Sequence, residues 1–85
     1  MNLYLVRRTS DCDYNEYEAA VVCAETEDAA RLTHPDGYSQ WVNGAWDNWR
    51  GGEKWDPPDR VTVQLLGEAV EGLERSVVLA HEWGD

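Results

Sequence analysis

Acidic residues form the densest group of chemically active side chains in this sequence of 85 residues. Between Thr9 and Ala30 there are seven acids and no base. Such a run can imitate the regular negative charge of a nucleic-acid backbone and occupy the basic groove of a nucleic-acid-binding protein. The alternative is a solvated acidic face that has no partner. If the run binds a partner, we expect the contacts to come from Asp11, Asp13, Glu16, Glu25, Glu27 and Asp28.

Metal binding is disfavoured by the spacing of the possible ligands. The run from Asp11 to Asn15 resembles the start of a calcium-binding EF-hand loop, but Glu16 stands where that loop needs glycine, and Val22 where it needs glutamate. The two histidines, His34 and His81, have no partner three or four residues away. We therefore expect a polar hairpin loop, no metal site and no cofactor.

Catalytic motifs are not evident either. Ser10, Ser39 and Ser76 lack the flanking glycines of a nucleophile elbow. Pairs of carboxylates are common in so acidic a chain, so they do not single out a general acid and base. The sequence predicts no catalytic residues and a protein that is not an enzyme.

The tryptophans suggest a second kind of contact. Residues 38–55 contain Tyr38 and four of the five tryptophans, interrupted by Asn-Gly and Gly-Gly turn signals. No single period fits these aromatic residues, so we expect a long, ordered loop with at most one helical turn. Trp46 and Trp49 are candidate anchors for a protein partner, or planes on which a sugar or small ligand stacks. The alternative is that most of them pack against a sheet that one short helix cannot cover.

The elements that must position these residues follow from the apolar patterns. Strands are expected over residues 3–8, 17–24, 61–66 and 76–83, and the first two can pair as a hairpin. Thr26 is a good N-cap for a short helix, which His34-Pro35 brings to an end. Residues 67–75 read as a second hairpin loop or a marginal helical turn. The prediction is one α+β domain over residues 1–85, a four-stranded antiparallel sheet of β-β-α-β-β order with the helix and the Trp-rich loop on one face.

The same pattern places the acids. Because the acidic run covers a loop, a strand edge and the first helical turn, we expect it to gather at one end of the fold. Cys23 lies in the apolar run and is expected in the core, whereas Cys12 lies among acids that raise the pKa of a thiol.

Charge and the absence of targeting signals narrow the partners. The formal net charge is −10, from 17 acids and 7 bases, which makes nucleic acid and anionic membranes poor direct partners and favours basic surfaces. The sequence shows neither a signal peptide nor a membrane-spanning stretch. We therefore expect a protein of the cytoplasm.

Several stretches together carry a resemblance: Leu-Tyr-Leu-Val-Arg-Arg-Thr at 3–9, Asp-Tyr-Asn-Glu-Tyr at 13–17, Ala-Ala-Arg-Leu-Thr-His-Pro at 29–35 and Val-Val-Leu-Ala at 77–80. Over nearly the whole chain the sequence resembles a group of short acidic proteins from bacteriophages and actinobacterial genomes. It departs at 81–84, where His-Glu-Trp-Gly replaces the usual ending. The resemblance implies a phage-linked origin. By analogy with small acidic phage proteins, it implies an inhibitor of host defence of the anti-CRISPR kind, acting in the host cytoplasm.

The functional hypothesis is therefore a non-enzymatic inhibitor that binds a basic, nucleic-acid-binding host defence protein through its acids, as a possible nucleic-acid mimic. One alternative is a module that binds small ligands or carbohydrates through the Trp-rich loop. Another is a structural phage accessory protein. The chain is expected to be a monomer, or a homodimer formed by pairing of exposed sheet edges.

Overall fold

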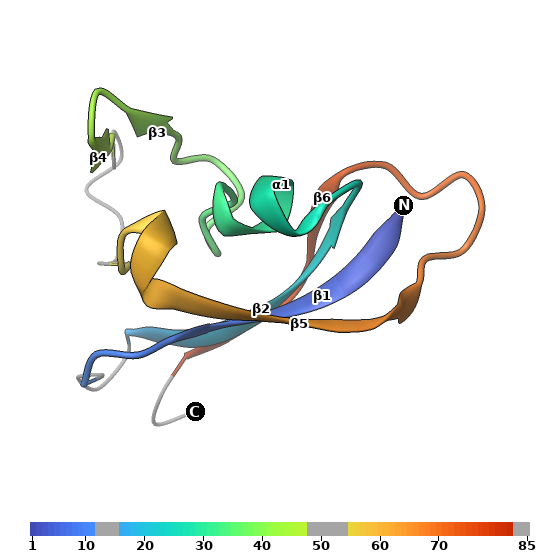
Figure 1. Cartoon of the computed structure of the whole chain (residues 1–85), viewed down its shortest axis with the longest axis horizontal. Coiled ribbons are helices and arrows are strands. Elements are labelled where there is room, and N and C mark those ends of the chain that lie inside the picture. Colours follow the sequence, from blue (N-terminus) through green and yellow to red (C-terminus); the bar gives the residue numbers. More distant parts are fainter. Residues whose placement is uncertain (12–15, 48–54, 83–85) are drawn as a thin grey trace.

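Four antiparallel strands form the main sheet of the computed structural model, which describes residues 1–11, 16–47 and 55–82 (Figure 1). They are β1 (Asn2–Arg8), β2 (Tyr17–Ala24), β5 (Val61–Glu68) and β6 (Ser76–Glu82). Their order across the sheet is β5-β1-β2-β6. The predicted α+β class, with a four-stranded antiparallel sheet and a single short helix, is confirmed for the described residues.

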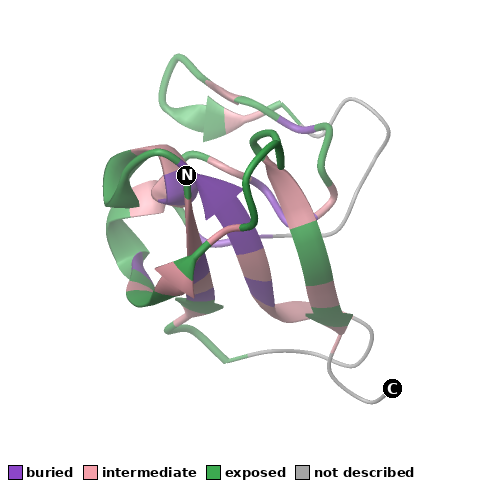
Figure 2. Cartoon of the chain, turned by 90° about the vertical axis from the view of Figure 1, so that its right-hand side faces the viewer, coloured by how far each residue is buried: buried purple, intermediate pink, exposed green. Residues whose placement is uncertain are grey.

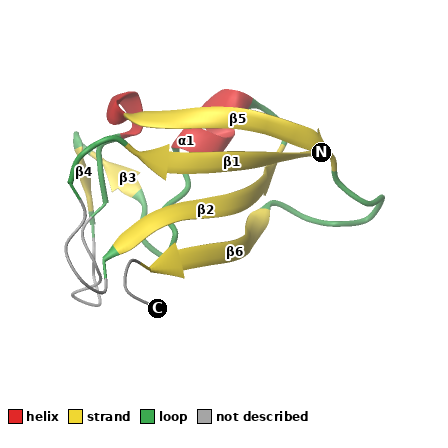
Figure 3. Ribbon diagram, turned by 90° about the horizontal axis from the view of Figure 1, so that it is seen from below, coloured by secondary structure: helices red, strands yellow, loops and turns green. Residues whose placement is uncertain are grey.

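The order of the strands corrects one expectation. β5 and β6 do not form a second hairpin with each other, because β5 pairs with β1 and β6 pairs with β2. The hairpin of β1 and β2 therefore lies in the centre, and residues 69–75 cross from one edge of the sheet to the other (Figure 3). Either pairing satisfies the alternation of apolar residues in the strands, so that alternation alone did not choose between them.

The helix α1 (Glu27–Arg31) covers one face of the sheet. As predicted, Thr26 caps it: the Thr26 hydroxyl accepts a hydrogen bond of 3.1 Å from the backbone N–H of Ala29. Ala30 is fully buried, and the Arg31 guanidinium donates a 2.7 Å bond to the carbonyl of Val61. Because five residues are too few for a stable isolated helix, this packing against β1, β2 and β5 holds the helix in place.

The segment expected as a long Trp-rich loop contains more regular structure than predicted. A small hairpin forms from β3 (Trp41–Val42) and β4 (Ala45–Trp46), and the 3-10 turn η1 (Pro58–Arg60) precedes β5. Asn43 and Gly44 both have positive φ angles, 52° and 82°, as the central residues of a tight hairpin turn require. The chain therefore carries two short strands beyond the predicted β-β-α-β-β elements.

The core lies between the sheet and the segments that pack on one of its faces, which are α1 and residues 55–61 (Figure 2). Alternate residues of the central hairpin point toward α1 and are buried. They are Tyr4, Val6, Ala20 and Val22. Trp55 and Val61 close this core, and Cys23 is buried as predicted, although on the other face of the sheet. Among the described residues no helix is long and apolar enough to cross a membrane.

Candidate functional surfaces

One end of the sheet collects acids from two distant parts of the chain. Asn2, at the start of β1, pairs with Ala24 on one side and with Glu68 on the other. Glu25 follows Ala24 directly, so the register places Glu25 and Glu68 at the same end. We call this the helix end: residues 1, 25–28 and 68–74, on the right in Figure 1.

The helix end carries six acids, all exposed. Three follow β2 and begin α1, and three belong to the end of β5 and the connection to β6. Within the described ranges none of the six forms a salt bridge, and the nearby Arg75 guanidinium instead donates to the Ala29 carbonyl and to the Thr33 hydroxyl. The six are Glu25, Glu27, Asp28, Glu68, Glu71 and Glu74.

Apolar side chains stand among these acids. Val70 is 74% exposed in the connection between β5 and β6, and Met1 and Leu73 are also exposed. The connection is fixed at its base, because the N–H of Ala69 donates a 3.0 Å bond to the Met1 carbonyl. Exposed apolar groups ringed by charge are typical of protein-binding surfaces.

The opposite end of β2 holds the other acids of the predicted group. We call it the turn end: residues 8–11, 16–17 and 55–60. Asp11 is exposed there, Glu16 is half-buried, and Asp13 lies outside the described residues. The eight residues of β2, at about 3.3 Å each, separate the two ends by about 25 Å. The expectation that the acidic run gathers at one end was wrong, because an extended strand carries the chain across the whole sheet.

Two acids of the turn end, Asp56 and Glu16, face inward. The Asp56 carboxylate accepts hydrogen bonds from the backbone N–H groups of Thr9 and Ser10, at 3.1 and 3.2 Å, and from the Ser10 hydroxyl at 2.6 Å. The Arg8 guanidinium lies 3.7 Å from Asp56 and 3.8 Å from Glu16. Arg8 also donates to the Ser10 hydroxyl, so the guanidinium and the carboxylate share this group. This cluster joins the end of β1 to the segment before η1.

The cluster determines how Asp56 ionises. Burial opposes ionisation of the carboxyl, but the hydrogen bonds from Ser10 and Thr9 and the charge of Arg8 outweigh it and lower the pKa of Asp56 below 3.8. Burial likewise opposes ionisation of Asp36, and bonds from Ser39 and Tyr38 reverse that effect and lower its pKa. Both carboxyls are therefore charged structural groups at neutral pH.

The aromatic residues are mostly structural. The Trp46 ring is half-buried, and its indole N–H donates a 2.9 Å bond to the Asp56 carbonyl. Trp46 packs edge-on against Trp41 and against His34, with ring centroids 5.3 and 5.2 Å away. The structure therefore favours a packing role for Trp46 over an exposed anchor. Trp49 lies outside the described residues.

His34 was missed as a core residue. Its side chain is fully buried, surrounded by Tyr17, Trp46 and Trp55. Its Nδ1 accepts a 3.0 Å bond from the backbone N–H of Asp36. From the sequence, His34 was set aside as a metal ligand and interpreted as part of the signal that ends the helix. Its position between the helix and a cluster of aromatic residues was the one available hint of burial.

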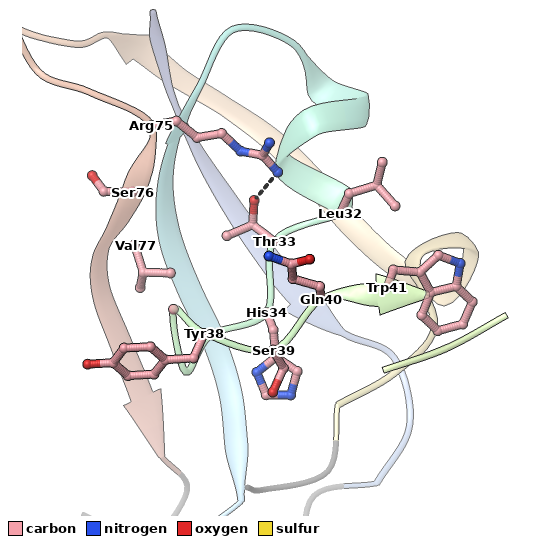
Figure 4. A pocket seen from close by; sticks show the side chains of 11 residues that line it. Leu32, Thr33, His34, Tyr38, Ser39, Gln40, Trp41, Arg75, Ser76 and Val77 are labelled. Atoms are coloured by element: carbon pink, nitrogen blue, oxygen red, sulfur yellow. Dashed lines mark hydrogen bonds between the residues drawn. The ribbon is translucent and has the colours of Figure 1, made fainter. Parts of the chain in front are cut away.

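A polar hollow of about 480 Å³ lies between the β3 side of the small hairpin and the start of β6 (Figure 4). The Tyr38 and Trp41 rings stand on two sides of it, and Arg75 and Thr33 lie at its upper rim. Tyr38 is 67% exposed, so its ring is accessible to a ligand. The described residues contain no group of three His, Cys, Asp or Glu that could hold a metal ion.

Comparison with known proteins does not extend this picture: no family model matches the sequence, and neither a curated protein nor a solved structure matches it significantly.

Proposed function

We propose that the protein is a small acidic binding protein whose helix end contacts a basic, nucleic-acid-binding host protein. The observation that supports this proposal is the convergence of six exposed acids from two chain segments on one end of the sheet. Exposed carboxylates without intramolecular partners leave their field available to a cationic surface. In this proposal Glu25, Glu27 and Asp28 keep their predicted role, and Glu68, Glu71 and Glu74 join them.

The finer proposal is inhibition. A surface of closely spaced carboxylates can occupy a groove that normally binds phosphates, and the displaced nucleic acid then cannot bind. The resemblance to short acidic phage proteins suggests that the target is a defence protein of the anti-CRISPR kind in the host cytoplasm. In this scheme the protein acts by occupancy, without catalysis, cofactor or metal.

Two matched charge variants test the helix end. Replacing Glu71 and Glu74 by Lys changes the net charge by +4, from −10 to −6, and replacing Asp11 and Asp59 by Lys makes the same change at the turn end. Each variant and the wild type serve as bait in a nuclease-treated bacterial lysate, with elution by rising salt. The basic protein captured by the wild type is then purified, and its association rate is measured with all three baits.

We expect the helix-end variant to associate on the order of 10-fold more slowly and the turn-end variant to stay close to the wild type. The difference should shrink at high salt because exposed charges are screened. Equal losses in both variants would show that only net charge matters and would contradict a localised surface.

The hollow supports a second candidate, a binding site for a carbohydrate or a small aromatic ligand. The accessible Tyr38 ring and the Trp41 ring can stack on a planar or sugar ligand, and polar groups line the space between them. A titration of tryptophan fluorescence with sugars and nucleosides should then show saturable quenching that is insensitive to salt. Tyr38→Ala should abolish it without lowering the melting temperature. Quenching that survives this substitution would place the ligand elsewhere.

A further inference from the structure

The face of the sheet opposite α1 carries a row of apolar side chains. Register places these residues together, because Leu5 pairs with Val21 and Val21 pairs with Leu79. Leu3 continues the row along β1 beside the buried Cys23. Figure 3 views the sheet from this side, and no described helix or strand covers it. We call this surface the open face, formed by Leu3, Leu5, Arg7, Ala19, Val21, Thr62, Gln64, Leu79 and His81.

The open face is more exposed than a sheet face in a stable two-layer fold needs to be. Leu79 is 65% exposed on the outer strand β6, while Leu5 and Val21, on the two central strands, are half-buried. A sheet with two apolar faces is normally covered on both, either by helices or by a second sheet about 10 Å away. Here Met1 and Leu73 cover Cys23 at one end of this face, and no described helix or strand covers the rest, which leaves it to a binding partner.

Charge indicates which partner fits. The strand residues described on the open face include one base, Arg7. Glu18 lies 4.0 Å from Arg7 and 3.6 Å from His81, and the charges of Arg7 and Glu18 cancel. The net charge of the chain is −10, which makes the open face far less acidic than the molecule as a whole. A basic partner would prefer the helix end. A second copy of this chain meets least repulsion at the open face.

We propose that two copies of the protein pack open face against open face as a weak dimer with two-fold symmetry. With the two-fold axis parallel to the strands, each strand pair lies over the partner's pair with β1 opposite β2. The row of Leu5, Val21 and Leu79 then lies over the same row of the second copy. Such a contact is isologous and closes after two copies.

The same axis places the charges well. It brings Arg7 over the Ala19 position of the partner, beside the partner's Glu18. The intramolecular pair of Arg7 and Glu18 in each copy then lies next to the same pair of the second copy. An axis perpendicular to the strands would instead put the Arg7 guanidinium over Leu3 and remove it from water without an acid. Charge complementarity therefore selects the parallel axis.

The size of the open face sets the strength of the contact. Four strands about 4.8 Å apart and rows of about six residues give roughly 400 Å² per copy, below the ~800 Å² of a standard interface. We expect a dissociation constant on the order of 100 µM. Because the two copies repel each other through their net charge, added salt should strengthen the dimer. The proposed hetero-complex at the helix end has the opposite dependence, so the two proposals fail independently.

The test is the mass of the protein by sedimentation equilibrium, from about 10 µM to 1 mM chain at low and high salt. The chain mass is 9.7 kDa, and the wild type should approach twice that value at the highest concentration. Leu79→Glu puts a charge on the outer strand β6, where the row packs against the partner's β5, and should weaken the dimer by about 10-fold or more. A wild type that stays at the monomer mass throughout would overturn the proposal.

Leu65→Glu is the matched control. Leu65 is 59% exposed on the outer strand β5, but it pairs with Tyr4 and so lies on the α1 side of the sheet. The control should dimerise as the wild type does, and far-ultraviolet circular dichroism should show that both variants are folded. Loss of the dimer in Leu65→Glu with retention in Leu79→Glu would overturn the proposed face.

A charge exchange tests the orientation of the two copies. Arg7→Glu leaves Glu18 facing like charge across the axis and should weaken the dimer by about 5-fold or more. Adding Glu18→Arg restores opposite charges in both copies and should recover most of the loss. A double variant as weak as Arg7→Glu alone would overturn the parallel axis.

Discussion

At the turn end the Asp56 and Glu16 carboxylates point at Arg8 and are shielded from water, whereas the six carboxylates of the helix end point into solvent. The residue types are the same, and the two ends differ in the donor groups that surround the carboxylates. Asp56 meets two N–H groups and a guanidinium, while the helix-end acids have no cation bound to them among the described residues. Acids of the first kind stabilise the fold, and those of the second kind are available for a partner.

The strongest way to break this comparison is to remove Asp56. Asp56→Ala removes one acid from the buried Arg8 and frees the N–H groups of Thr9 and Ser10. We expect the free energy of unfolding to fall by about 3 kcal/mol, measured by urea denaturation followed by tryptophan fluorescence. A loss below about 0.5 kcal/mol would mean that the cluster does not stabilise the fold and that the acids of the two ends do not differ in this respect.

Lowering the pH should distinguish the structural carboxylates from the exposed ones without any mutation. The pKa values of Asp56 and Asp36 are lowered in the folded chain below 3.8, so the folded state favours their charged forms. Their contribution to stability is complete above the unfolded pKa and is lost as the pH falls below about 4 through the lower folded values. Thermal melts between about pH 6 and 2.5 should show this loss.

The matched control for the acid effect is Asp56→Asn, which has no carboxyl to protonate at this site. Its melting temperature should be lower at neutral pH and should fall less steeply on acidification than that of the wild type. Parallel curves for the two proteins would place the acid-sensitive groups elsewhere.

The smallest effect on stability is expected at the helix end. Replacing Glu71 and Glu74 by Lys reverses two exposed charges in a chain of net charge −10. The free energy of unfolding should therefore fall by about 0.5 kcal/mol or less, or it should rise. The melting temperature by circular dichroism measures it. A loss above about 1 kcal/mol would show that these acids hold the fold together and are not free for a partner.

The sequence predicted the local elements well because their causes are local. Alternating apolar residues defined the four strands of the sheet, and the Thr26 hydroxyl with Glu27 and Asp28 defined the start of the helix. The order of the strands was not predictable in the same way. Nothing in the pattern of β5 says that it pairs with β1 rather than with β6, since both partners present apolar residues at the same period.

The candidate site was predicted only in part. The acidic run was visible, but its division by β2 follows from strand length, and the contribution of Glu68, Glu71 and Glu74 depends on which strands are neighbours. Their spacing at three-residue intervals between two strands was the available signal. The inward position of Glu16 depends on Arg8, which Asp56 also contacts from the segment before η1, and no local pattern predicts that these three residues meet.

The central position of the β1 and β2 hairpin has a consequence for how the protein is made. These strands leave the ribosome before β5 and β6, and both of their outer edges stay unpaired until the partners that begin at Val61 and Ser76 are made. During synthesis the hairpin presents two unpaired edges while the intervening chain is completed, and closure over such long separations is slow compared with helix formation. A nascent chain of this kind has its greatest exposure to aggregation just before β6 emerges.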